Sequence, residues 1–177
     1  MTLPASERER IRAYLVEKAG TSSVEELIER VEAGMAELCA AAEAVPRDRF
    51  GERPPGEEWS PLDCLQHTVH WNSEVARAVL HAALTGEVVA GPIPAGALPP
   101  DDAGVPSERE ALIEAMRQAN VSLYEHVRAA DPGSFLEVRW EHPFFGMLNW
   151  REWLLFLRLH ALDHARQLTA MRDALRA

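Results

Sequence analysis

The sequence has few cationic residues and no long apolar run. Its 177 residues include 18 Lys and Arg against 28 Asp and Glu, which gives a formal net charge of -10. Phosphate binding needs clustered cations, so we expect no nucleic-acid partner. No apolar run approaches the roughly 20 residues that span a bilayer, and the first residues lack the apolar stretch of a signal peptide. We therefore expect a cytoplasmic protein without a membrane partner.

Cysteine is also scarce. Cys39 and Cys64 are the two cysteines, and each lies on the apolar face of a different predicted helix. We expect buried free thiols and not a disulfide, and we assign neither thiol a redox role. A serine-nucleophile motif, a phosphate loop and a second catalytic acid are not recognisable either. The sequence therefore names no general acid or base.

Hydrophobic residues make up 47% of the chain and charged residues 26%, the balance of one globular domain over residues 1–177. Five Ser or Asn residues are followed three places later by an acid, the capping box that opens a helix. These pairs are Ser6 with Glu9, Ser22 with Glu25, Ser60 with Asp63, Ser107 with Glu110, and Asn149 with Glu152. They predict helices over about 6–19, 24–45, 60–84, 107–130 and 150–175, with Gly20 ending the first.

Two connections are long. The segment from Thr85 to Pro106 has 22 residues, five of them Pro and four Gly. An extended segment of this length can return along a helix, so the helices before and after it can run parallel. We predict that it is a crossover within one domain, because neither side alone has enough apolar stripes for a core. The second link, 134–148, contains the alternating stretch 135–140, which predicts a short strand without an identified partner.

Two histidines in the last helix share one face. His160 and His164 are four residues apart, so both imidazoles can reach one ion. A buried imidazole needs partners at both nitrogens, and a shared cation would satisfy two stacked rings. The alternative is a pair of core histidines, with His160 bonded across to Asn120 or Tyr124. The spacing alone leaves both interpretations open.

Two further motifs resemble the DinB/YfiT-like family. Residues 59–67, from Trp59-Ser60-Pro61 to His67, are similar to the opening of that family's second bundle helix. Residues 142–146 and 160–168 resemble its last loop and its His-x-x-x-His helix. The resemblance implies an all-α four-helix bundle of up-down-down-up topology over 22–175, with residues 1–20 as an additional short N-terminal helix.

The resemblance also implies a metal site. His67, His160 and His164 match the family's three ligands, a facial triad that leaves positions for water or substrate. Neutral imidazoles suit Zn²⁺ or Ni²⁺ better than Mg²⁺ or Ca²⁺. His70, one turn after His67, is the alternative ligand. We interpret His81, His126 and His142 as surface, helix-face and loop residues without a metal partner, although His142, before Pro143, could overhang the site. Arg158 and Arg166 are expected on the far side of the helix, exposed to solvent.

Three kinds of function follow. The first is a metalloenzyme acting on a small-molecule substrate, of the thiol S-transferase or hydrolase type, with a low-molecular-weight thiol as a second cofactor. The second is a protein that binds or sequesters a small molecule without turnover. The third is a structural metal that ties helices together, against which three ligands with an open site argue. A homodimer stays open, and the sequence does not choose the substrate.

Overall fold

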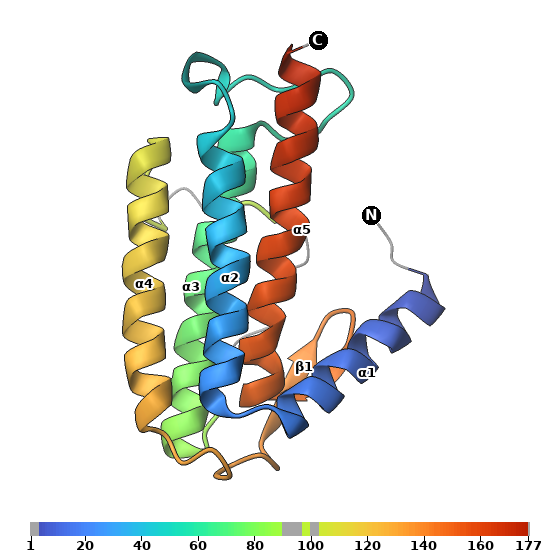
Figure 1. Ribbon diagram of the computed structural model, residues 1–177, viewed down its shortest axis with the longest axis vertical. Helices are drawn as coiled ribbons and strands as arrows, with labels where there is room; N and C mark the ends of the chain where they lie inside the picture. Colours follow the sequence, from blue (N-terminus) through green and yellow to red (C-terminus); the bar gives the residue numbers. More distant parts are fainter. Residues whose placement is uncertain (1–3, 90–96, 100–102, 177) are drawn as a thin grey trace.

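The computed structural model describes residues 4–89, 97–99 and 103–176, and over these residues the chain is mostly helical (Figure 1). One antiparallel hairpin follows the fourth helix, with Arg139 paired to Asn149 and His142 to Gly146. The described elements are α1 (Ala5–Thr21), α2 (Val24–Glu43), the short 3₁₀ turn η1 (Arg47–Arg49), α3 (Pro61–Thr85), α4 (Arg109–Ala129), β1 (Arg139–His142), β2 (Gly146–Asn149) and α5 (Trp150–Arg176). The predicted all-helical class is confirmed, with the small hairpin as an addition.

Four long helices lie side by side, and α1 leaves them at an angle (Figure 1). Helix α5 packs on α2 and α3, and α4 packs on α3 and α2. Each helix has an apolar stripe that enters one shared core. At Gly34 in α2, an added Cβ would lie 3.1 Å from Cγ of Arg158 and 3.2 Å from its carbonyl oxygen. Glycine at this position therefore lets α2 and α5 approach closely.

Two of the five predicted capping boxes open the helices that form the candidate site. At the start of α3, the Ser60 hydroxyl accepts from the backbone N–H of Asp63, and the Asp63 carboxylate accepts from that of Ser60. At the start of α5, Asn149 and Glu152 make the equivalent reciprocal bonds. Pro61 occupies the first turn of α3, where a missing N–H is tolerated. These two predictions are confirmed.

The other three predicted boxes are wrong. Helix α2 is capped one residue later than predicted, by Ser23 with Glu26, and Glu25 forms a bidentate ion pair with Arg128 at 2.8 and 2.9 Å. Ser22 instead ends α1, where its backbone N–H donates to the carbonyl of Lys18. Helix α1 begins at Ala5 and α4 at Arg109, and neither has a side-chain cap. In place of capping Ser107, the Glu110 carboxylate binds the guanidinium groups of Arg109 and Arg47.

Two predicted boundaries also differ. Gly20 does not end the first helix, because α1 continues to Thr21 and Ser22 takes an extended conformation. The strand predicted over 135–140 begins only at Arg139, and β2 is the partner that the sequence did not reveal.

Among the described residues, no helix is long and apolar enough to cross a membrane.

A buried guanidinium joins three segments at the base of the bundle. Arg151, in the first turn of α5, is 7% exposed. Its Nε donates to the carbonyl of Ala19 at 2.9 Å, one terminal nitrogen donates to Pro132 at 3.1 Å, and the other donates to Ser22. These acceptors lie at the end of α1 and in the link after α4. A positive charge is favourable at the carboxyl end of α1 because of the helix dipole.

Gly86 ends α3 and begins the long crossover. Its φ is +72°, and an added Cβ would lie 2.5 Å from Cδ1 of Phe135. We expect Gly86→Ala to lower the free energy of unfolding by at least about 2 kcal/mol, from left-handed backbone strain and the clash. Urea denaturation measures the change. Gly20→Ala is the control: it is helical with open space at Cβ, so it should stabilise by about 0.5–1 kcal/mol. Equal stability of Gly86→Ala and wild type would contradict the left-handed conformation and the close contact assigned to Gly86.

Candidate metal centre

Three histidines meet where α3 packs on α5. One nitrogen of each of His67, His160 and His164 lies within 4.8 Å of one nitrogen of each of the others. His67 and His164 are buried and His160 is half-buried. Over residues 4–89, 97–99 and 103–176, this is the only group of three or more His, Cys, Asp or Glu side chains close enough to share an ion. The structure thus brings together the three residues that the sequence selected.

His70 does not join this group. It lies one turn beyond His67, and its ring packs edge-on against Trp71 with centroids 4.7 Å apart. The ring centroid of His67 lies 5.4 Å from that of His160 and 5.0 Å from that of His164. The rotation of α3 against α5 therefore directs His67 to the cluster.

Every Nδ1 in the cluster faces an oxygen. His67 Nδ1 lies 2.5 Å from the carbonyl oxygen of Ala97, His160 Nδ1 lies 2.7 Å from Oδ1 of Asn72, and His164 Nδ1 lies 2.9 Å from Oε1 of Gln167. The Ala97 carbonyl only accepts, so His67 Nδ1 carries the ring hydrogen and donates it. With the amide oxygens of Asn72 and Gln167 turned to the other two rings, His160 and His164 carry hydrogen on Nδ1 as well. The Cys64 sulfur also lies 3.5 Å from His164 Nδ1. The alternative in which His160 bonds across to Asn120 or Tyr124 does not hold, because Asn72 on α3 is the partner of its Nδ1.

With hydrogen on Nδ1, the Nε2 atom of each ring carries no hydrogen and has a free lone pair. The Nε2 atoms of His160 and His164 lie 3.0 Å apart. With both hydrogens on Nδ1, two lone pairs face each other at this distance, which is unfavourable unless a cation or a proton lies beside them. A Zn–N bond is about 2.1 Å, so two nitrogens on one ion are at most about 4.2 Å apart. Three nitrogens within 4.8 Å therefore fit one divalent ion after a small inward movement of the rings.

A proton is the poorer solution because the surroundings oppose charge on these rings. Burial lowers the pKa of His67 to about 4, against the contrary effect of its bond to Ala97. Burial, followed by the neighbouring histidines, lowers the pKa of His160 well below the usual value. Burial also lowers the pKa of His164. All three rings are thus neutral at pH 7, the form that binds a metal ion.

Aromatic rings surround the cluster. The Trp59 ring lies 4.8 Å from that of His67 and stacks near His164 at 6.4 Å. Phe156 stacks on His160 at 5.6 Å. The indole N–H of Trp71 donates to the carbonyl of Ala97 at 2.9 Å, the same oxygen that accepts from His67. Trp71 and His67 thus attach residue Ala97 of the 85–106 segment to the site.

The interpretation of His142 as a loop residue is wrong. It ends β1, is 4% exposed, and packs between Phe145 at 4.5 Å and Phe156 at 4.3 Å. Its Nδ1 accepts from the backbone N–H groups of Phe144 and Phe145. Burial lowers its pKa to about 4. The two consecutive phenylalanines that follow Pro143 were the signal, in the sequence, of an apolar environment.

The remaining predicted residues lie outside the cluster. Cys39 and Cys64 are buried free thiols, as expected. His126 is exposed, and its ring bonds to the carbonyl of Ser122. Arg158 is half-buried, not exposed as predicted, and reaches the hydroxyl of Tyr14 on α1 at 3.4 Å.

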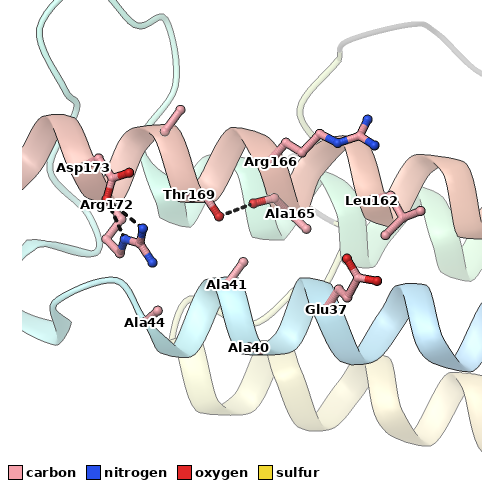
Figure 2. Close-up of a pocket in the computed structure, with 11 residues that line it drawn as sticks. Glu37, Ala40, Ala41, Ala44, Leu162, Ala165, Arg166, Thr169, Arg172 and Asp173 are labelled. Atoms are coloured by element: carbon pink, nitrogen blue, oxygen red, sulfur yellow. Dashed lines mark hydrogen bonds and ion pairs between the residues drawn. The ribbon is translucent and has the colours of Figure 1, made fainter.

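A pocket of about 630 Å³ lies between α2 and α5 (Figure 2). Small side chains line most of it, among them Ala40, Ala41 and Ala165, and Arg166 and Glu37 stand at its edge. At 3.6 residues per turn, Arg166 and Thr169 point about half a turn away from His160 and His164. The pocket is therefore separate from the candidate metal centre.

Comparison with known proteins identifies a matching family and a solved structure of the same fold. The sequence model of the DinB superfamily matches residues 30–168, which include all three histidines. Among solved structures, a mutant of a mycothiol-dependent maleylpyruvate isomerase superposes with a TM-score of 0.62 at 18% sequence identity. The alignment covers 85% of this chain and 62% of the isomerase chain, and at this identity it shows a shared fold. No curated protein matches the sequence significantly.

Proposed function

The chain belongs to the DinB superfamily, and we propose that it is a metal-dependent enzyme acting on a small molecule through His67, His160 and His164. The observation that carries the proposal is the hydrogen bonding of the cluster. An oxygen faces each of the three Nδ1 atoms, and with hydrogen on Nδ1 each ring keeps an unprotonated Nε2. Neutral imidazole nitrogens suit Zn²⁺ or Ni²⁺.

The reaction we propose is thiol-dependent transfer or hydrolysis. A bound divalent ion lowers the pKa of a coordinated water or thiol toward 7 and so supplies a nucleophile at neutral pH. Three neutral ligands leave the charge of the ion uncompensated, which favours an anionic partner such as a thiolate. The superposed isomerase depends on mycothiol, a low-molecular-weight thiol, and this supports a thiol as second cofactor here.

The side chains around the cluster have defined tasks in this proposal. Asn72, Gln167 and the Ala97 carbonyl hold the three rings with Nε2 toward the centre. Trp59 and Phe156 flank the rings. An apolar substrate body would pack against such rings.

The main alternative is a protein that binds or sequesters a small molecule without turnover. One observation favours it: among the residues that the structure describes, the cluster contains three histidines and no carboxylate that could move a proton. Turnover with a thiol and an electrophilic substrate separates the two functions, because sequestration predicts stoichiometric binding without product.

The proposal extends to the architecture and cellular setting. It includes one domain over residues 1–177, the up-down-down-up order of the long helices, a cytoplasmic location and a homodimer. Figure 1 supports the helix order, because α3 and α4 both begin at the end of the bundle where α2 and α5 end.

Cobalt substitution tests the proposed chemistry. We expect a Co²⁺-loaded sample to change its visible spectrum when a thiol is added, because a thiolate would enter the coordination sphere. Methionine, a thioether that cannot form a thiolate, is the matched control and should leave the spectrum nearly unchanged. A tetrahedral spectrum that does not respond to thiols would indicate a closed site and would contradict the enzymatic proposal.

A further inference from the structure

We propose that Asn72 and Gln167 are positioning residues that set which nitrogen of His160 and His164 carries hydrogen, and that Met35 and Cys64 fix the orientation of the two amides. The inference rests on the proposed metal centre and names the groups that keep it ready for an ion. An amide can face a histidine with its oxygen or with its NH₂ group, and the two orientations have opposite consequences.

The amide of Asn72 presents its oxygen to His160. It is 4% exposed and lies on α3 between α5 and α2. Its Oδ1 lies 2.7 Å from His160 Nδ1, and its Nδ2 lies 3.6 Å from Sδ of Met35. A thioether accepts weakly and has no hydrogen to donate, so Met35 favours the NH₂ end. The oxygen end is thereby turned to His160, whose Nδ1 must carry the hydrogen.

Gln167 is held from both sides by donors. Its Oε1 accepts from His164 Nδ1 at 2.9 Å and from the thiol of Cys64 at 3.5 Å. The Cys64 sulfur also lies 3.5 Å from His164 Nδ1, but with hydrogen on Nδ1 the thiol hydrogen is directed to Oε1, and a reversed amide would place an NH₂ group against the ring N–H. Cys64 therefore helps to keep the oxygen toward His164. This gives the buried thiol a role that requires neither a disulfide nor a redox reaction.

The consequence of reversal is specific. If either amide presented NH₂ to its histidine, Nδ1 would become the acceptor and the hydrogen would move to Nε2. That hydrogen would then point into the 3.0 Å gap between the Nε2 atoms of His160 and His164. It would have to leave before an ion could bind. Loss of such an outer hydrogen-bond partner commonly lowers metal affinity roughly 10–100-fold.

The test compares variants that remove the acceptor with variants that keep it. Asn72→Leu and Gln167→Met preserve approximate volume but lose the oxygen, and we expect each to weaken Zn²⁺ binding about 10–100-fold in a chelator competition titration. Asn72→Asp and Gln167→Glu retain an accepting oxygen and should bind at least as tightly as wild type. Thermal unfolding of the metal-free proteins identifies any variant whose fold is lost.

A second measurement reads the hydrogen positions directly. Long-range ¹H–¹⁵N spectra of the metal-free protein should show hydrogen on Nδ1 of His160 and His164. In Asn72→Leu the Nε2–H form should appear at His160 alone, and in Gln167→Met at His164 alone. A general structural disturbance would not produce this pattern.

The results separate this inference from the proposed function. Wild-type protein that binds no Zn²⁺ refutes the metal centre, although the hydrogen positions can still be measured. Wild-type binding with unchanged affinity and unchanged hydrogen positions in Asn72→Leu and Gln167→Met refutes the positioning role alone. Loss of affinity in Asn72→Asp and Gln167→Glu equal to that in the apolar variants also refutes it.

Discussion

Replacing His160 by alanine is expected to abolish stoichiometric binding of Zn²⁺. His160 supplies one of only three candidate ligands among the described residues, and its Nε2 lies 3.0 Å from that of His164. Removal of a ligand should cost more than the roughly 10–100-fold that loss of an outer partner costs. His67→Ala should behave in the same way, since it contributes the cluster's ligand from α3. Titration calorimetry and metal analysis after dialysis measure both effects.

His70→Ala is the matched control, because His70 lies on the same helix but packs against Trp71 outside the cluster. It should bind one equivalent of Zn²⁺ with nearly wild-type affinity. Full affinity in His160→Ala or His67→Ala would remove that residue from the site. Loss of binding in His70→Ala would instead make His70 a ligand.

Replacing Arg151 by methionine is expected to lower the free energy of unfolding by about 3 kcal/mol or more. The guanidinium donates to the carbonyls of Ala19, Ser22 and Pro132, and methionine donates to none of them. A buried polar group left without a partner costs about 1–3 kcal/mol, and solvent can reach only some of these carbonyls after the change. Arg151→Lys should recover part of the loss, because one ammonium cannot reach three separated acceptors.

Urea denaturation of metal-free samples measures this effect, with Arg47→Met as the control at an exposed ion pair. Hydrogen exchange adds a local test, since α1 is held to α5 partly through Arg151. In the Arg151→Met variant, the backbone amides of α1 should therefore lose protection before those of the other helices. A loss of stability no larger than that of Arg47→Met would contradict the role assigned to this residue.

The sequence predicted which segments are helical more accurately than the residue at which each helix begins. Apolar stripes located the helical segments because burial of one face decides whether a segment is helical. Ser22 with Glu25 and Ser23 with Glu26 are equivalent boxes one residue apart, so local pattern cannot choose between them. In the structure Ser22 ends α1, and its carbonyl accepts from the buried Arg151, 129 residues later in the chain. Helix starts that depend on such tertiary contacts cannot be read from local sequence.

The site was predictable to a similar degree. The spacing of His160 and His164 indicated a shared face, whereas His67 came only from the family resemblance, because α3 also presents His70 one turn away. Asn72 and Gln167, whose amides face the histidines, have a weaker signal in the sequence. Gln167 is one turn after His164, and Asn72 is a polar residue on the apolar face of α3 that packs against α5. Polar side chains in such places need a buried partner.

Metal analysis of protein purified without a nickel column tests the central claim most directly. The proposed centre predicts close to one Zn²⁺ or Ni²⁺ per chain, or uptake of one equivalent when the metal-free protein is titrated with Zn²⁺. The His67→Ala variant, purified and titrated in the same way, should contain and take up almost no divalent metal. Wild-type protein that contains no divalent metal and takes up none on titration would contradict the assignment of His67, His160 and His164 as a metal centre.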